Sequence, residues 1–247
     1  MKVTTTPATE TTLELGGLRA ISVGDPEAAP VVVVLLHGFQ MSPADLSPFA
    51  HSLQAPAWFL FPEAPLVAAP RGRAWWHIDA QQRERALALG PRDFAVQHPP
   101  DLPAARDRLR GLLADVAPRV GGRPLVLGGF SQGGMLACDT VLRSDVLRAD
   151  LGLSAMALLS ASRIAFDEWA PLLAQPRLRG LPVLVSHGEQ DDDLAFSAGE
   201  ALRDCLTAAG AAVDWLPFAQ GHEIPLVVWR RLRKLIGALA AEPRAKP

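Results

Sequence analysis

Several features that would point to particular classes of protein are scarce or missing in this sequence. Only two cysteines, Cys138 and Cys205, occur among 247 residues, which is too few for a disulfide framework, and they lack metal-ligand spacing. The longest uninterrupted aliphatic run, residues 31–36, is far shorter than the ~20 residues that a membrane-spanning helix needs. The sequence therefore predicts buried free thiols, no metal site and no membrane span.

An excess of charge of either sign is also lacking. Lys and Arg together number 24 against 26 Asp and Glu, a net charge of −2, and the basic residues are spread along the chain. This pattern argues against nucleic acid as a partner. The first dozen residues, MKVTTTPATETT, have no apolar core of a secretory signal. We therefore expect a cytoplasmic protein, although the mature form of an exported protein would look the same.

What the sequence does contain is an alternation of short apolar runs with longer amphipathic stretches, which is typical of a mostly parallel sheet covered by helices. Apolar residues make up 49% of the chain, enough for a folded core. We expect one α/β domain over residues 1–247, with Ser42 as the N-cap of its first helix and a frayed tail at 242–247. Strands are predicted at 13–23, 31–36, 57–61, 125–127, 155–159, 183–186 and 212–216, and helices at 44–53, 102–120, 133–143, 166–173, 198–209 and 224–241.

Residues 62–100 interrupt this alternation. The segment is too long for a plain strand-to-helix connection and contains six prolines. A short helix at 81–89 is predicted within it. We interpret the segment as a cap-like insertion beside a functional site.

The pattern Gly-x-Ser-x-Gly at residues 129–133 lies where a predicted strand turns into a predicted helix. In this context the serine occupies a strained turn with its hydroxyl exposed, and the two glycines let strand and helix pass closely. The sequence therefore predicts Ser131 as a catalytic nucleophile.

A serine nucleophile needs a base, and the base needs a group that orients it. Of the six histidines, His222 is the best base, because it follows Gly221 in a loop between the last predicted strand and the last helix. His37 and His187 each precede a glycine at a strand end, and we interpret them as structural residues bonded to nearby loop backbone.

The orienting acid is expected between Ser131 and His222 in the chain. Three consecutive aspartates follow the 183–186 strand, and since like charges repel, at most one of them is expected to be buried against His222. We choose Asp191, with Asp192 as the alternative, and expect the remaining aspartates to face solvent or cap the next helix. Asp214 and Glu189 are weaker candidates.

Two backbone N–H groups are expected to stabilise the oxyanion of an acyl-transfer reaction. One belongs to Gln132, directly after the nucleophile. The other belongs to Phe39, because Gly38 before it lets the chain turn so that this amide faces inward.

In these loops the chain resembles the α/β-hydrolase superfamily, and within it the phospholipase/carboxylesterase family that includes acyl-protein thioesterases. The matching motifs are LLHGF at 35–39, GFSQGG at 129–134, HGEQD at 187–191 and GHEIP at 221–225. The resemblance implies that Ser131, His222 and Asp191 form the catalytic triad, with Asp191 preferred over its neighbours, and that Phe39 and Gln132 supply the oxyanion-hole amides. It implies no metal and no organic cofactor.

The chain departs from the thioesterase pattern after Phe39 and in the insertion, where it is similar to bacterial esterases. Trp75, Trp76 and Met41 lie in these divergent segments and are assigned to substrate binding, although the adjacent tryptophans would equally suit fixing the insertion onto the body.

The function predicted from these resemblances is a serine carboxylesterase for short- to medium-chain esters, with a small-molecule ester as its partner. The alternatives are a lysophospholipase, acyl-thioesterase or polyester hydrolase with the same triad, an amidase, and a non-catalytic binding scaffold. A homodimer through apolar residues of the insertion is left open.

Overall fold

A computed structural model describes residues 9–144, 147 and 150–242 of the chain. The strands are β1 (Glu10–Leu15), β2 (Leu18–Val23), β3 (Val31–Leu36), β4 (Ala57–Pro62), β5 (Leu66–Val67), β6 (Arg73–Ala74), β7 (Leu125–Phe130), β8 (Leu153–Leu159), β9 (Pro182–Gly188) and β10 (Ala212–Phe218). The helices are α1 (Ser47–Leu53), α2 (Ala80–Leu87), α3 (Leu102–Val120), α4 (Gln132–Leu142), α6 (Phe166–Leu173), α7 (Phe196–Ala208) and α8 (Leu226–Ala241), with short 3-10 turns at Pro43–Asp45 and Pro176–Leu178.

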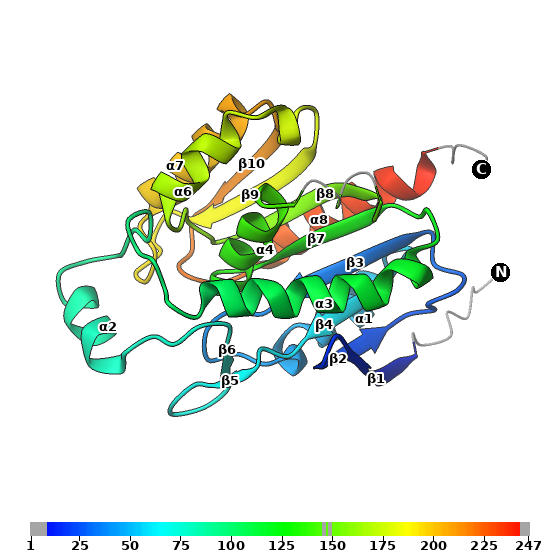
Figure 1. Ribbon diagram of the computed structural model, residues 1–247, viewed down its shortest axis with the longest axis horizontal. Coiled ribbons are helices and arrows are strands. Elements are labelled where there is room, and N and C mark those ends of the chain that lie inside the picture. Colours follow the sequence, from blue (N-terminus) through cyan, green and yellow to red (C-terminus); the bar gives the residue numbers. More distant parts are fainter. Residues whose placement is uncertain (1–8, 145–146, 148–149, 243–247) are drawn as a thin grey trace.

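Within these described residues, eight strands form one sheet in the order β1-β2-β4-β3-β7-β8-β9-β10 (Figure 1). The pairs from β4 through β10 are all parallel, whereas β1 pairs with β2 and β2 with β4 in antiparallel fashion. The predicted α/β-hydrolase fold with a mostly parallel sheet is therefore confirmed. Among the described residues, no helix has the length and apolar character needed to cross a membrane.

The single strand predicted at residues 13–23 is wrong. The segment is a hairpin of β1 and β2, in which Leu15 pairs with Leu18 across Gly16 and Gly17. Both glycines have positive φ, 57° and 72°, the conformation that a tight two-residue hairpin turn requires and that glycine adopts without a Cβ penalty.

The helix predicted at 44–53 is also interrupted. A 3-10 turn at Pro43–Asp45 precedes α1, because Pro48 in the first turn of α1 has no N–H to continue a helical ladder through it. Ser42 does begin the turn, and its N–H and hydroxyl both donate to the Asp45 carboxylate, at 2.7 and 2.9 Å.

The central strands are buried on both faces, and each face has its own apolar core. Along β3, the even-numbered residues pack with α3, α4, α6 and α7, and the odd-numbered residues pack on the opposite side with α1 and α8. Figure 1 shows α3 in front of the sheet and α8 behind it. This double burial explains the continuous apolar character of the inner strands.

The insertion predicted at 62–100 contains a two-stranded sheet, β5 and β6, and then α2, before the chain enters α3. In Figure 1, α2 lies apart from the helices that cover the sheet. Residues 243–247 of the predicted tail lie outside the described residues.

Candidate active site

Ser131 occupies the sharp turn between β7 and α4. Its backbone has φ 51° and ψ −118°, a positive φ that costs a non-glycine residue conformational energy. A Cβ on Gly129 would lie 2.5 Å from the backbone of Gly133, and one on Gly133 would lie 2.5 Å from the Leu36 carbonyl oxygen. The predicted strained turn and the predicted close passage of strand and helix are both confirmed.

His222 brings the serine and an aspartate into one chain of hydrogen bonds. Its Nε2 lies 2.9 Å from Ser131 Oγ, and its Nδ1 lies 2.7 Å from Asp191 Oδ2. A carboxylate only accepts hydrogen bonds, so Nδ1 carries the proton and Nε2 is left to accept from the serine hydroxyl. The imidazole also packs against the Phe130 ring, with centroids 4.8 Å apart. The arrangement leaves the histidine poised to take the serine proton.

Asp191 is buried and receives several hydrogen bonds. The N–H groups of Asp193 and Leu194 donate to its Oδ1, at 2.9 and 2.8 Å. Burial raises the pKa of the carboxyl group, but hydrogen bonds from His187, His222 and the Leu194 N–H outweigh it and hold the pKa well below its usual range. The carboxylate is therefore negatively charged at neutral pH and can act as the counterion of a protonated His222.

The other acidic candidates lie elsewhere. Asp192 and Glu189 are exposed, and Asp214 on β10 faces Arg231 on α8 at 3.3 Å. The expectation that the third aspartate, Asp193, faces solvent or caps the next helix is wrong. Its carboxylate is partly buried and accepts hydrogen bonds from two arginines of the insertion. These arginines are about a hundred residues away in the chain, so the sequence around Asp193 does not indicate the contact.

His37 and His187 are both fully buried and bonded to loop backbone, as predicted. The His37 Nδ1–H donates to the Gly38 carbonyl at 2.8 Å, and its Nε2 accepts from the Ala64 N–H at 3.1 Å. Burial lowers the pKa of His37 to about 4, so the ring stays neutral. The Nε2–H of His187 donates to the Leu194 carbonyl at 3.1 Å and lies 3.3 Å from Asp191 Oδ2, which places it directly behind the candidate acid.

The two residues predicted to supply oxyanion donors both lie beside the serine. Phe39 follows the end of β3, and Gln132 is the first residue of α4. Both line a cavity of about 20 Å³ beside Ser131. The other lining residues are mostly apolar: Trp76, Ile78, Arg92, Phe94, Met135, Asp193 and Leu194.

The side chain of Gln132 has a role that the sequence did not suggest. Its Oε1 accepts from the Trp75 N–H at 2.8 Å, and its Nε2 donates to the Trp76 carbonyl at 2.9 Å. The Trp75 indole N–H donates to the His37 carbonyl at 2.9 Å. The start of the insertion is thus bonded to both loops that carry the candidate oxyanion donors.

The structure separates the three residues assigned to substrate binding. Trp76 lines the cavity beside Ser131, but Trp75 and Met41 do not line it. Trp75 is buried against His37, with ring centroids 5.5 Å apart, and so fixes the insertion to the body. Met41 forms an isolated β-bridge with Arg73 and packs on the apolar core of α1 and α8.

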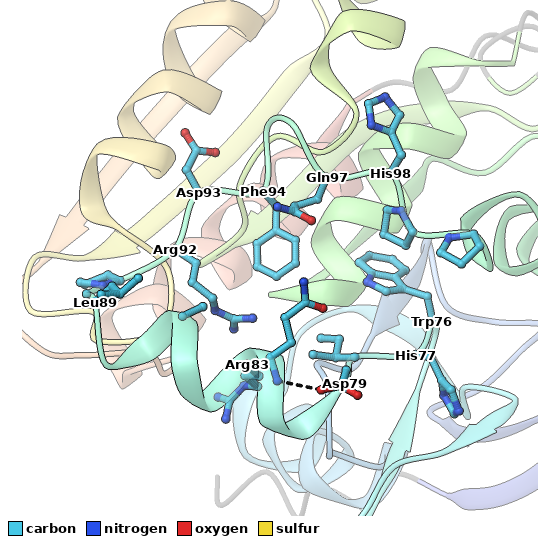
Figure 2. Close-up of a pocket in the computed structure, with 17 residues that line it drawn as sticks. Trp76, His77, Asp79, Arg83, Leu89, Arg92, Asp93, Phe94, Gln97 and His98 are labelled. Carbon is cyan, nitrogen blue, oxygen red and sulfur yellow. Dashed lines mark hydrogen bonds between the residues drawn. The ribbon is translucent and has the colours of Figure 1, made fainter.

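A larger cavity of about 460 Å³ lies within the insertion and was missed from the sequence. We call it the insertion chamber. Figure 2 shows α2 and the segment with Arg92, Phe94 and Gln97 facing each other across it, and Trp76 on a third side. The chamber forms because the proline-rich segment folds back on itself. The periodicity of apolar residues in the sequence does not predict such a fold.

Within residues 9–144, 147 and 150–242, no group of three or more His, Cys, Asp or Glu side chains is placed to hold a metal ion. Cys138 is buried in α4 and Cys205 partly buried in α7, and both thiols are free. Burial raises the pKa of Cys205 to about 11.

Comparison with known proteins agrees with this geometry. The sequence profile of the phospholipase/carboxylesterase family matches residues 109–239, which include Ser131, Asp191 and His222. Esterase PE8 has a similar solved structure, with TM-score 0.68, 23% identity and coverage of 95% of this chain and 100% of that one. SOBER1 of Arabidopsis thaliana (TM-score 0.65, 22% identity, 85% and 98% coverage) and a Bacillus cereus carboxylesterase (0.65, 16%, 90% and 94%) share the same fold.

Proposed function

The chain belongs to the phospholipase/carboxylesterase family and is a serine hydrolase of ester bonds, and from this premise we propose that it hydrolyses short- to medium-chain carboxylic esters through an acyl-enzyme at Ser131. The observation that carries the proposal is the continuous contact from Ser131 Oγ to His222 Nε2, at 2.9 Å, and from His222 Nδ1 to Asp191 Oδ2, at 2.7 Å. These are hydrogen-bond distances for proton transfer.

In the acylation step, Ser131 Oγ attacks the carbonyl carbon while its proton passes to His222 Nε2. The resulting tetrahedral oxyanion is stabilised by the N–H groups of Phe39 and Gln132, the latter at the N-terminus of α4. The bond to the alkoxy oxygen then breaks, and the histidine returns the proton to the departing alcohol.

Deacylation repeats these steps with water. The histidine takes a proton from water as the water oxygen attacks the acyl carbon, and it returns the proton to Ser131 Oγ as the carboxylic acid leaves. Asp191 remains anionic throughout, because its hydrogen bonds keep the pKa of the carboxyl group well below its usual range. It therefore stabilises the imidazolium that forms in each step.

The small space beside the serine supports short chains. The cavity that contains Ser131 measures about 20 Å³ and is lined mainly by apolar side chains. The apolar lining next to the serine suits a short acyl group.

The test is the initial rate on p-nitrophenyl esters from acetate to palmitate, measured for the parent protein and for Ser131→Ala. We expect turnover to peak at short acyl chains and to fall at least about a thousandfold in the variant. Ser197→Ala, at an exposed serine on α7, is the matched control and keeps the parent rate.

A peak at long chains would replace the proposal with a lysophospholipase or thioesterase. Matched ester and amide substrates separate an esterase from an amidase. If the folded parent protein turned over none of these substrates and formed no covalent adduct with a fluorophosphonate probe, the binding-scaffold hypothesis would replace the proposal.

A further inference from the structure

The insertion chamber adjoins the small cavity that contains Ser131. Trp76, Ile78, Arg92 and Phe94 line both the chamber and the small cavity that contains Ser131. At about 460 Å³, the chamber falls within the range of roughly 300–1,000 Å³ typical of small-molecule sites. An ester with its carbonyl at the serine therefore has room to extend its other part into the chamber.

Two arginines that line the chamber are held by Asp193, a residue that lines the small cavity. The Arg83 Nη2 donates to Asp193 Oδ2 at 2.6 Å, and the Arg92 Nη2 donates to the other carboxylate oxygen. The Arg83 guanidinium also lies 6.0 Å from the centre of the Phe39 ring, and that of Arg92 lies 4.7 Å from the centre of the Phe94 ring. These contacts fix both cations beside the path to the serine.

The two guanidinium groups share one carboxylate, because Arg83 and Arg92 both pair with Asp193. Of the two carboxylates that line the chamber, Asp93 pairs with Arg163 at 3.1 Å, and the exposed Asp79 accepts from the Gln82 N–H at 2.7 Å.

The buried Nε atoms of both arginines also lack a hydrogen-bond partner within the described part of the chain. A buried N–H without a partner costs free energy, and a ligand oxygen can relieve that cost. Guanidinium groups match the oxygens of carboxylates and phosphates in geometry as well as charge.

We propose that the insertion chamber selects esters that carry a negative charge, a carboxylate or a phosphate, on the part of the molecule that extends away from the scissile bond, with Arg83 and Arg92 as the specificity-determining residues. This inference rests on the proposed ester hydrolysis at Ser131. The apolar side chains of Trp76, Ile78 and Phe94 cover the carbon chain between the two ends of such a substrate.

The kinetic test compares each charged substrate with its neutral methyl ester. On the acyl side, p-nitrophenyl hydrogen adipate is compared with methyl p-nitrophenyl adipate. On the alcohol side, 4-acetoxybenzoate is compared with methyl 4-acetoxybenzoate, and 4-acetoxyphenyl phosphate with its dimethyl ester. We expect the charged member of at least one pair to have a kcat/KM about tenfold higher, the size of one charge-assisted hydrogen bond. The carboxylate and phosphate arms distinguish the two kinds of anion.

The variant for this test is Arg83→Gln, in which Asp193 keeps Arg92 as its partner. We expect the charged-to-neutral ratio of kcat/KM to fall to near one. Arg85→Gln makes the same change at an exposed position of the same helix, outside the chamber, and keeps the parent ratio. Arg83→Lys retains the charge and keeps a ratio above that of Arg83→Gln.

A second readout does not depend on turnover. In the Ser131→Ala background, calorimetry measures binding of monomethyl adipate and of dimethyl adipate, with and without Arg83→Gln. Tighter binding of the charged ligand that is lost with Arg83→Gln supports the chamber even if the protein hydrolyses none of the esters. Turnover of esters with equal kcat/KM for charged and neutral members, or a ratio that Arg83→Gln leaves unchanged, overturns the inference and leaves the proposed function intact.

Discussion

The candidate site has two parts that are built in contrasting ways. The serine, histidine and aspartate lie in short loops at the carboxyl ends of β7, β10 and β9, three strands of the main sheet, of which β7 and β9 are buried. The insertion chamber is formed by α2, which has no buried residue, and by the loop that follows it. The first part belongs to the main sheet, and the second is joined to the body by the ion pairs of Asp193 and by backbone hydrogen bonds of the loop after α2, such as the Arg92 N–H to the Asp193 carbonyl at 2.9 Å.

This difference separates the residues that catalyse the reaction from those that select the substrate. Positions at the ends of parallel strands are fixed by the whole sheet, which suits groups that must meet within hydrogen-bond distance. Since α2 has no buried residue, its side chains can change at little cost to the fold. We therefore expect substitutions at the sheet ends to abolish turnover and substitutions on the chamber side of α2 to change which ester is preferred.

The largest effect is expected at the acid. Asp191→Asn keeps the shape of the side chain but presents an amide to His222, which favours the wrong tautomer of the imidazole. We expect kcat to fall about 10³- to 10⁴-fold, as for the equivalent change in other serine hydrolases. Initial rates on p-nitrophenyl butyrate measure this loss.

Asp192→Asn is the matched control, because it makes the same change at the next, exposed residue. Its rate is expected to stay within about twofold of the parent, in line with the small effects of exposed substitutions. The reverse order of the two variants would move the acid to Asp192.

The same contrast explains which features could be predicted from the sequence. The alternation of apolar runs predicted the parallel sheet, because buried strands leave a strong periodic signal. Ser131, His222 and Asp191 could be predicted to meet, since the carboxyl ends of parallel strands lie along one edge of the sheet. The hairpin at Gly16 and Gly17 was not predicted. Its turn depends on the positive φ angles of these two glycines, which the apolar pattern of residues 13–23 does not indicate.

The insertion was predicted as a cap-like segment with a short helix at 81–89, which corresponds to α2, but its side-chain contacts were not predicted. The pairing of Arg83 and Arg92 with Asp193 joins residues 110 and 101 positions apart, and no local pattern encodes such a contact. The same holds for the bonds from the Gln132 side chain to the backbone at Trp75 and Trp76.

A second prediction concerns the point where the two parts join. Gln132→Leu leaves the buried Trp75 N–H and Trp76 carbonyl without partners, each at a cost of about 1–3 kcal/mol, so we expect the free energy of unfolding to fall by about 4 kcal/mol. Urea denaturation measures it. Gln190→Leu, at an exposed glutamine, is the control. An equal loss of stability in both variants would show that the hydrogen bonds of Gln132 do not stabilise the fold.

A third prediction uses pH at the same junction. The pKa of buried His37 is lowered to about 4, below the ordinary value of about 6.5. The folded protein therefore binds fewer protons than the unfolded chain between these values, and the stability contributed by neutral His37 is present above pH 6.5 and lost as pH falls toward 4. This loss amounts to about 3 kcal/mol between pH 7 and pH 4.

Denaturant unfolding at several pH values checks this sign and size. His37→Gln keeps a polar side chain but removes the titrating ring, so the variant loses less stability than the parent over the same pH range. Parallel curves for the two proteins would show that His37 does not contribute to acid sensitivity.

The smallest effect is expected on α2 itself. The Asp79 carboxylate caps this helix by accepting the Gln82 N–H at 2.7 Å, and its replacement by alanine costs a helix about 1 kcal/mol. Because α2 buries no residue in the core, we expect Asp79→Ala to increase hydrogen exchange within α2 while the rate of fluorophosphonate labelling at Ser131 stays unchanged. Glu84→Gln, on the exposed face of the same helix, leaves both quantities at the parent value. A labelling rate that fell together with α2 protection would show that the chamber and the catalytic loops are coupled, and the separation of chemistry from selection would then fail.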